Sequence, residues 1–121
     1  MSLRLVFRIA SIVSLINGIG LLFMTATFFE MASFTISESL ITAGQFLGVT
    51  VIFLALLQWR IPDIAENSIS SLGKLFGIGQ ILWLLILGYH MMIGQAAGAT
   101  AYINAVLFVV FAILFFTGKS E

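Results

Sequence analysis

Three long stretches of the sequence contain no Asp, Glu, Lys or Arg, and they constrain the fold more than any other feature. They cover residues 9–29, 39–59 and 75–118. A helix needs about 20 apolar residues to cross the hydrocarbon core of a bilayer, and each stretch is at least that long. The whole chain is 61% hydrophobic and 8% charged, which is too apolar for a soluble domain of ordinary composition. We therefore expect an integral membrane protein.

The third stretch is about twice as long as one spanning helix requires, so the chain should reverse direction inside it. Its sequence GQAAGAT, at residues 94–100, is the natural turn, because glycine and small polar residues weaken a helix. Helices satisfy their own backbone hydrogen bonds in lipid, and the alternating pattern of barrel strands is absent. The sequence predicts one all-α transmembrane domain over residues 1–121, a four-helix bundle with helices at about 5–28, 38–59, 72–93 and 99–117.

The basic side chains are confined to one side of this four-helix layout. They lie at the two termini and in the connection between the second and third helices: Arg4, Arg8, Arg60, Lys74 and Lys119. Because basic residues gather on the cytoplasmic side of membrane proteins, we expect a multi-pass membrane protein with both termini in the cytoplasm. The formal net charge is zero, so the composition does not indicate binding to nucleic acid.

Two local patterns flank the predicted second helix. Thr35 and Glu38, in TISE, have the spacing of a capping box, which predicts the start of that helix. Pro62 favours a break after it. From Ile61 to Leu72, apolar residues recur at helical spacing, which fits a short helix lying on the membrane surface. A plain solvated loop is the alternative.

Glycines give the clearest packing signal, because lipid offers no hydrophobic drive for helix association and small residues let helices approach closely. One face of the second helix carries Gly44, Gly48, Val51 and Ala55, and one face of the third carries Gly73, Gly77, Leu84 and Gly88. We expect these faces to pack inside the bundle. An interface with other chains is the alternative.

Each predicted helix also carries an amide side chain, namely Asn17, Gln45, Gln80 and Asn104. At 1.5 Å of rise per residue, Asn17 and Gln45 both come to about mid-membrane, where they can meet. A hydrogen bond between them would set the register of two helices. The functional alternative is a polar contact to a small ligand, such as a quinone headgroup or a pigment carbonyl.

His90 is the single histidine of the chain. It lies on a stripe with Phe76 and Trp83 at seven-residue intervals, on the side of the third helix away from the glycines. We expect this stripe to face outward, with His90 and Tyr89 anchoring the helix at the membrane interface. A lone imidazole cannot complete a typical zinc site or a paired haem site, so no metal site is assigned. A magnesium-type pigment or a neighbouring subunit needs only one imidazole, so His90 joins Asn17 and Gln45 as a candidate ligand-binding residue.

No catalytic constellation is recognisable in the sequence. The chain contains no cysteine, which excludes disulfides, thiolate metal sites and a cysteine nucleophile. Glu30 and Glu38 bracket the first external loop and should be solvated, and no acidic residue lies deep in a predicted helix, which argues against ion-coupled transport. Arg8 is expected about one turn inside the membrane, where it either extends to the headgroups or pairs with Asp63 or Glu66.

The segment RIASIVSLINGIGLLF at residues 8–23, followed by a short external loop and a glycine-bearing helix, resembles small uncharacterised bacterial inner-membrane proteins with four helices. The likeness is one of layout over most of the chain. It implies a location in the cell inner membrane, and it implies no activity or cofactor. The leading hypothesis is a non-catalytic protein that acts through helix packing, as an accessory or scaffold subunit or as a homo-oligomer. Its partners would be membrane lipids and other membrane chains or copies of itself. The alternative is a binder or carrier of an apolar small molecule, such as a lipid, quinone or pigment, within the bundle.

Overall fold

A computed structural model describes residues 1–120, and the last residue of the predicted domain, Glu121, lies outside the described part. Four helices are long and apolar enough to cross a membrane, which confirms the predicted all-α layout. The helices are α1 (Leu3–Phe23), α2 (Thr25–Glu30), α3 (Glu38–Ile64), α4 (Ile69–Met92) and α5 (Gly98–Thr117), with a single 3-10 turn, η1 (Glu66–Ser68), before α4. The short α2 is not one of the four.

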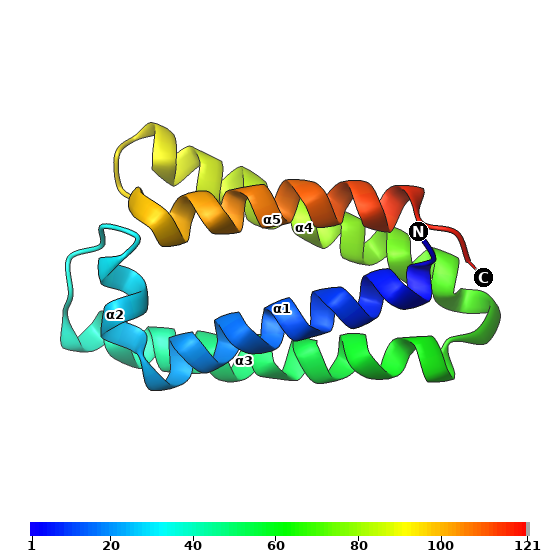
Figure 1. The fold of residues 1–121 in the computed structure, drawn as a ribbon. Helices are drawn as coiled ribbons and strands as arrows, with labels where there is room; N and C mark the ends of the chain where they lie inside the picture. The colour runs from blue at the N-terminus through cyan, green and yellow to red at the C-terminus, as the bar shows by residue number, and fades with distance from the viewer. Residues whose placement is uncertain (121) are drawn as a thin grey trace.

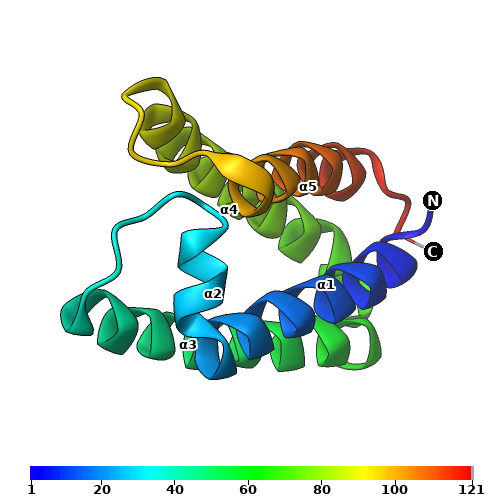
Figure 2. The same cartoon turned by 60° about the vertical axis from the view of Figure 1, so that its left-hand side comes forward.

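The predicted end of the first helix, at about residue 28, is wrong. The helix is interrupted at Met24, and a second, short helix, α2, follows. Met24 leaves helical geometry with φ −127° and ψ 45°. The hydroxyl of Thr25 donates to the carbonyl of Leu21, so the broken helix end keeps a hydrogen-bond partner. No glycine or proline marks this break. It directs α2 away from the axis of α1 and toward the α4–α5 turn (Figure 2).

The second helix begins at residue 38 as predicted, but its capping residue and its end differ from the prediction. The hydroxyl of Ser37 caps the start of α3 by accepting from the Leu40 amide at 3.1 Å, so Thr35 and Glu38 do not form the expected capping box. At the other end α3 continues through Pro62 to its last residue, Ile64. Pro62 has no N–H to donate to the Gln58 carbonyl and its ring crowds that carbonyl, but only two residues of the helix follow it. Neither a surface helix nor a long loop follows, because η1 leads directly into α4.

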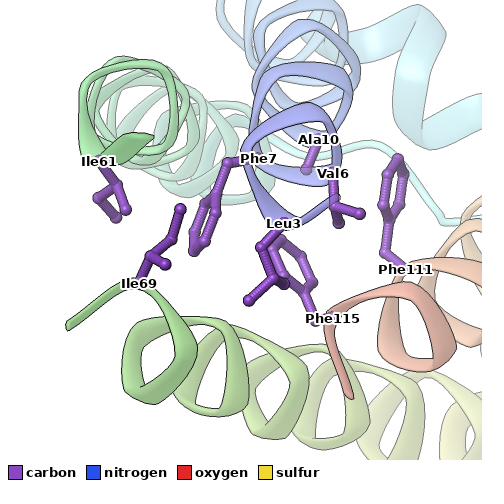
Figure 3. Close-up of a cluster of buried hydrophobic side chains, with 8 residues drawn as sticks. All are labelled: Leu3, Val6, Phe7, Ala10, Ile61, Ile69, Phe111 and Phe115. Atoms are coloured by element: carbon purple, nitrogen blue, oxygen red, sulfur yellow. The ribbon is translucent and has the colours of Figure 1, made fainter. Parts of the chain in front are cut away.

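The helices form two antiparallel hairpins, α1 with α3 and α4 with α5 (Figure 1). The hairpins meet at the end of the bundle where α1 begins and α5 ends, and side chains from α1, α3, α4 and α5 converge there (Figure 3). The buried members of this terminal core are Leu3, Val6, Phe7, Ala10, Ile61, Ile69, Phe111 and Phe115. Phe7 is fully buried and makes edge contacts with Phe76 and Phe115 at centroid distances of 5.2 and 5.0 Å.

Within the first hairpin, α1 and α3 approach to backbone contact at glycines. A Cβ built on Gly48 would lie 2.7 Å from the Leu22 amide nitrogen and 3.0 Å from the Gly18 carbonyl oxygen. The Ser11 hydroxyl donates to the Ala55 carbonyl across the same interface at 2.6 Å. The small-residue face that includes Gly44 and Gly48 therefore packs inside the chain.

The glycine face of α4 packs along only part of its length. A Cβ on Gly73 would lie 3.0 Å from Leu3 Cδ2, and one on Gly77 would lie 2.7 Å from Phe116 Cε2. Gly88 has open space around its Cβ position, with no heavy atom within 4 Å. The expectation that Gly88 shares the packing face is therefore not met in the chain, because the end of α4 stands away from its neighbours before the turn (Figure 2).

Backbone hydrogen bonds tie the two terminal segments together. The Leu3 amide donates to the Lys119 carbonyl at 2.7 Å, and the Lys119 amide donates to the Met1 carbonyl at 3.0 Å. Both terminal segments therefore lie at one end of the bundle (Figure 1).

An ionic cluster lies at this same end. Arg8 Nη2 is 2.8 Å from Asp63 Oδ1, and the Arg8 guanidinium carbon is 4.4 Å from the Trp59 ring centroid. Arg4 and Arg60 each approach the same carboxylate at 3.7 Å. The interpretation of Arg8 as a partner of Asp63 is confirmed. Three guanidinium groups share one carboxylate, so the cluster carries an excess of positive charge.

Candidate functional site

A cavity of about 520 Å³ lies between the two hairpins. Its volume falls in the range of about 300–1,000 Å³ that is typical of small-molecule sites. Ala10, Phe76 and Phe111 line the cavity and also belong to or pack on the terminal core, so that core closes one end of it. All four long helices and α2 contribute to its wall.

The other end of the cavity is closed by α2 and the α4–α5 turn. The Ala97 amide donates to the Ala32 carbonyl at 2.9 Å, and the Thr100 amide donates to the Met31 carbonyl at 3.3 Å. Ala32 and Thr100 also line the cavity. Gly98 makes this contact feasible, because it has φ +83° and a Cβ there would collide with the Met31 carbonyl oxygen.

The cavity reaches the molecular surface sideways, along α4. Leu75, Trp83 and Ile86 line it and are also exposed, at 61%, 41% and 51% of their surfaces. Since both ends are closed and these residues lie along a helix of spanning length, the opening faces the side that lipid would cover.

The lining is apolar apart from a few neutral or weakly basic groups. Its polar side chains are Ser14, Asn17, Gln58, Gln80, His90, Thr100 and Asn104. Among residues 1–120, no Asp, Glu, Lys or Arg lines the cavity. Within the same part of the chain, no three His, Asp or Glu side chains gather closely enough to hold a metal ion.

Gln58 is the most deeply buried polar side chain of the lining, with 3% of its surface exposed. Its Oε1 atom is buried and has no hydrogen-bond partner. Leaving a buried polar atom unpaired costs about 1–3 kcal/mol. The same atom has almost no accessible surface, so it lies behind the cavity wall and does not face the empty space.

The sequence analysis missed Gln58. A second helix ending at residue 59 would put it at the membrane surface, whereas the extension of α3 to Ile64 puts it inside the bundle. The sequence does contain a pattern that indicates this position. Gln58 continues an apolar stripe of α3 with three- and four-residue spacing, and every member of the stripe lines the cavity: Leu47, Val51, Leu54 and Gln58.

The structure does not bring Asn17 and Gln45 together, so the expected pairing is wrong. Asn17 lines the cavity. Gln45 is exposed and lies in a small hollow with Leu22 and Phe46, outside the cavity. Counting residues from a helix end gives depth in the membrane but not direction, and Gln45 lies on a different face of α3 from the residues that line the cavity. Gln80 and Asn104, the other two amides, do line the cavity with Asn17.

The expected outward direction of the His90 stripe is also wrong. Phe76, Trp83 and His90 all line the cavity. Trp83 stacks on Phe108 of α5 with centroids 6.0 Å apart and an interplanar angle of 23°. The side of α4 opposite its glycines faces inward because α4 packs on both α5 and the start of α1. His90 is half-buried near the outer end of the cavity, where its ring makes an edge contact with Tyr89 at 5.2 Å.

Three comparisons with known proteins bear on identity. No protein-family model matches the chain, no curated protein matches its sequence, and no solved structure matches its fold.

Proposed function

We propose that this chain is an intramembrane binding protein for an apolar small molecule taken up from the bilayer. The observation that carries the proposal is the cavity of about 520 Å³, closed at both ends by contacts within one chain and open sideways along α4. Apolar walls with a few convergent polar groups are typical of small-molecule sites. The proposal assigns no catalytic residue.

We further propose that the protein is a multi-pass component of the inner membrane with both termini in the cytoplasm. All five basic residues lie toward the end of the bundle that holds the terminal segments, and basic residues favour the cytoplasmic side. Glu30 and Glu38 lie at the opposite end. The terminal core, the ionic cluster and Gln58 would then lie toward the cytoplasmic leaflet.

A role as accessory subunit or homo-oligomer stays a prediction with less support. It depended on glycine faces that could receive other helices. Gly44, Gly48, Gly73 and Gly77 instead pack against side chains or backbone of the same chain. Gly88 is the one member of the predicted faces with free space beside it.

Filling the cavity tests the binding proposal. Gly79 lines the cavity and has no heavy atom within 4 Å of its Cβ position, so Gly79→Leu should project into the empty space without displacing a helix. Gly88→Leu is a matched control, because Gly88 lies on the same helix, has equally free space and is absent from the lining. Neither substitution requires a strained backbone.

The assay is labelling of the purified protein in lipid nanodiscs by a long-chain alcohol that carries a photoreactive diazirine on its chain. We expect Gly79→Leu to lose at least about tenfold of the saturable labelling, equivalent to about 1.4 kcal/mol. Gly88→Leu should label like the natural sequence. Native mass spectrometry of both variants would show whether lipids retained by the natural protein disappear only from Gly79→Leu. Equal labelling of all three proteins would refute the proposal.

A further inference from the structure

We propose that the ionic cluster binds the phosphate group of an anionic phospholipid at the end of the bundle that holds the terminal segments. The site is separate from the cavity, because none of the four charged residues of the cluster lines it: Arg4, Arg8, Arg60 and Asp63. The inference goes beyond the proposed uptake of an apolar molecule. It shares with that proposal only the insertion of the four long helices in a membrane.

The cluster places three cations around one anion. Arg8 Nη2 lies 2.8 Å from Asp63 Oδ1. Arg4 Nη2 lies 3.7 Å from the same oxygen, and Arg60 Nη1 lies 3.7 Å from Oδ2. Within residues 1–120, no second carboxylate pairs with these arginines, and Glu66, which follows in the same connection, forms no ion pair. Three positive charges and one negative charge leave a local formal charge of +2, which a bound anion would compensate.

Most hydrogen-bond donors of the cluster have no partner in the protein. Each guanidinium group carries five N–H donors. Arg8 donates to Asp63 and Arg4 donates to the Pro62 carbonyl, whereas the contacts at 3.7 Å are too long for hydrogen bonds. Arg60 donates no hydrogen bond within the described part of the chain, and 64% of its side chain is exposed. A phosphate matches these free donors, because its oxygens can accept two parallel hydrogen bonds from one guanidinium group.

The fold holds two of the three arginines in place before any ligand binds. The Arg4 guanidinium donates at 2.5 Å to the Pro62 carbonyl, one of the last carbonyls of α3, which have no partner within a helix. The Arg8 guanidinium carbon lies 4.4 Å from the centroid of the Trp59 ring. Side chains that are already ordered lose less conformational entropy on binding. Arg60 is therefore the arginine that a bound anion would order.

The depth of the cluster indicates that the phosphate belongs to a lipid. The charge-free stretch 39–59 of α3 spans about 30 Å, the thickness of the hydrocarbon core, so the charged residues that follow it lie at the level of the headgroups. The surface on the membrane side is apolar. Ile12 lies one turn beyond Arg8 on α1, Leu56 lies one turn before Arg60 on α3, and both side chains are exposed. A phospholipid with its phosphate at the cluster would lay its acyl chains on this surface, from which a free phosphate ion would gain nothing.

Two matched charge removals test the assignment. Arg60→Gln removes the most exposed guanidinium group of the cluster. Lys74→Gln removes one positive charge at the same end of the bundle, but Lys74 is exposed and lies outside the cluster. The proteins are placed in phosphatidylcholine nanodiscs that contain a graded minor fraction of phosphatidylglycerol. Native mass spectrometry then counts the phosphatidylglycerol molecules that each chain retains.

We expect the natural protein and Lys74→Gln to retain one phosphatidylglycerol molecule per chain. Arg60→Gln should need at least about fivefold more phosphatidylglycerol for the same occupancy, equivalent to about 1 kcal/mol. In nanodiscs of phosphatidylcholine alone, Arg60→Gln should unfold at the same temperature as the natural protein, which shows that it is folded. Phosphatidylglycerol should raise the unfolding temperature of the natural protein more than that of Arg60→Gln, because a ligand stabilises the state that binds it.

Three results would overturn the inference. Equal retention by the natural protein and Arg60→Gln would mean that the cluster is only structural. An equal loss in Lys74→Gln would mean that net charge attracts the lipid without a defined site. In phosphatidylcholine nanodiscs, stabilisation by inorganic phosphate as large as that by phosphatidylglycerol, relative to chloride at equal ionic strength, would mean that the cluster binds a free anion.

The cavity variant separates this site from the proposed function. Gly79→Leu should retain phosphatidylglycerol like the natural protein, because the cavity and the cluster share no charged residue. If phosphatidylglycerol disappears from Gly79→Leu but stays on Arg60→Gln, the lipid binds in the cavity and the inference fails while the proposed function stands. If Gly79→Leu keeps its labelling by the photoreactive alcohol while Arg60→Gln loses phosphatidylglycerol, the proposed function fails and the inference stands.

Discussion

Adding one methyl group at Gly48 should separate α1 from α3. The Cβ of Gly48→Ala would lie 2.7 Å from the Leu22 amide nitrogen, whereas ordinary van der Waals contact begins at 3.4 Å. The atoms in conflict are backbone, and the Gly18 carbonyl oxygen stands at 3.0 Å on the same side, so no side chain can rotate away. The helices must therefore move apart locally by about 0.7 Å, the difference between these two distances.

The magnitude follows from what that separation loses. Overpacking a tight interface costs about 1–3 kcal/mol. A gap of about 0.5–1 Å also forfeits a quarter to a half of each dispersion contact along the seam. The hydrogen bond from Ser11 to Ala55, now 2.6 Å, would lengthen with the seam. Because helices persist in the dissociated state within a membrane, alanine gains little from its higher helix propensity. We expect Gly48→Ala to lower the free energy of unfolding by about 2–4 kcal/mol.

Reversible unfolding in bicelles by titration with sodium dodecyl sulfate, followed by tryptophan fluorescence, measures this difference. Gly88→Ala is the control, since its Cβ enters free space, and it should stay within about 0.5 kcal/mol of the natural sequence. A loss in Gly48→Ala no larger than that of Gly88→Ala would refute the assignment of the α1–α3 contact.

Three further predictions concern the ends of the bundle. Asp63→Asn removes the carboxylate that pairs with Arg8, and because both side chains are partly exposed it should cost at most about 1 kcal/mol, a difference that 1 M salt should remove in the same titration. Gly98→Ala should cost about 1–3 kcal/mol, because φ is +83° and a backbone carbonyl occupies the Cβ direction; an unchanged midpoint would mean that the turn does not dock on the end of α2. In a chain without native cysteine, Ser2→Cys and Ser39→Cys should react with a membrane-impermeant maleimide from opposite sides of intact vesicles, and reaction from one side would contradict the topology.

Particular elements show how far the sequence predicts the fold. The long charge-free stretches predicted four spanning helices, and the glycines at 94 and 98 marked the turn, where both have positive φ. The break at Met24 was not predictable in the same way, because no glycine or proline occurs there. It is accompanied by hydrogen bonds between the residues that follow α2 and the α4–α5 turn, which are far apart in the sequence. At Pro62 the sequence predicted a helix break that the structure does not have, because α3 continues to Ile64. The presence of Pro62 in the last turn of α3 removes one hydrogen bond, which the burial of Ile61 in the terminal core can offset.

The candidate site was largely hidden from the sequence. Asn17, Gln80 and Asn104 stood out as amides in apolar helices, and all three line the cavity. Gln58 was overlooked and His90 was assigned to the wrong side. Periodicity groups residues onto one face of a helix, but it does not indicate which neighbour that face meets.

Four helices of spanning length and apolarity follow from the amino-acid sequence alone, because the length and charge of each segment set the free-energy cost of placing it in hydrocarbon. The sequence also placed small residues where helices can approach closely. The cavity between the two hairpins, and the place of Gln58 in its wall, follow from the packing of the helices. Those features depend on contacts between residues that are far apart in the sequence. The terminal core joins the two hairpins at one end, and the hydrogen bond from the Ala97 amide to the Ala32 carbonyl joins them at the other. The cavity is the space left between these two contacts.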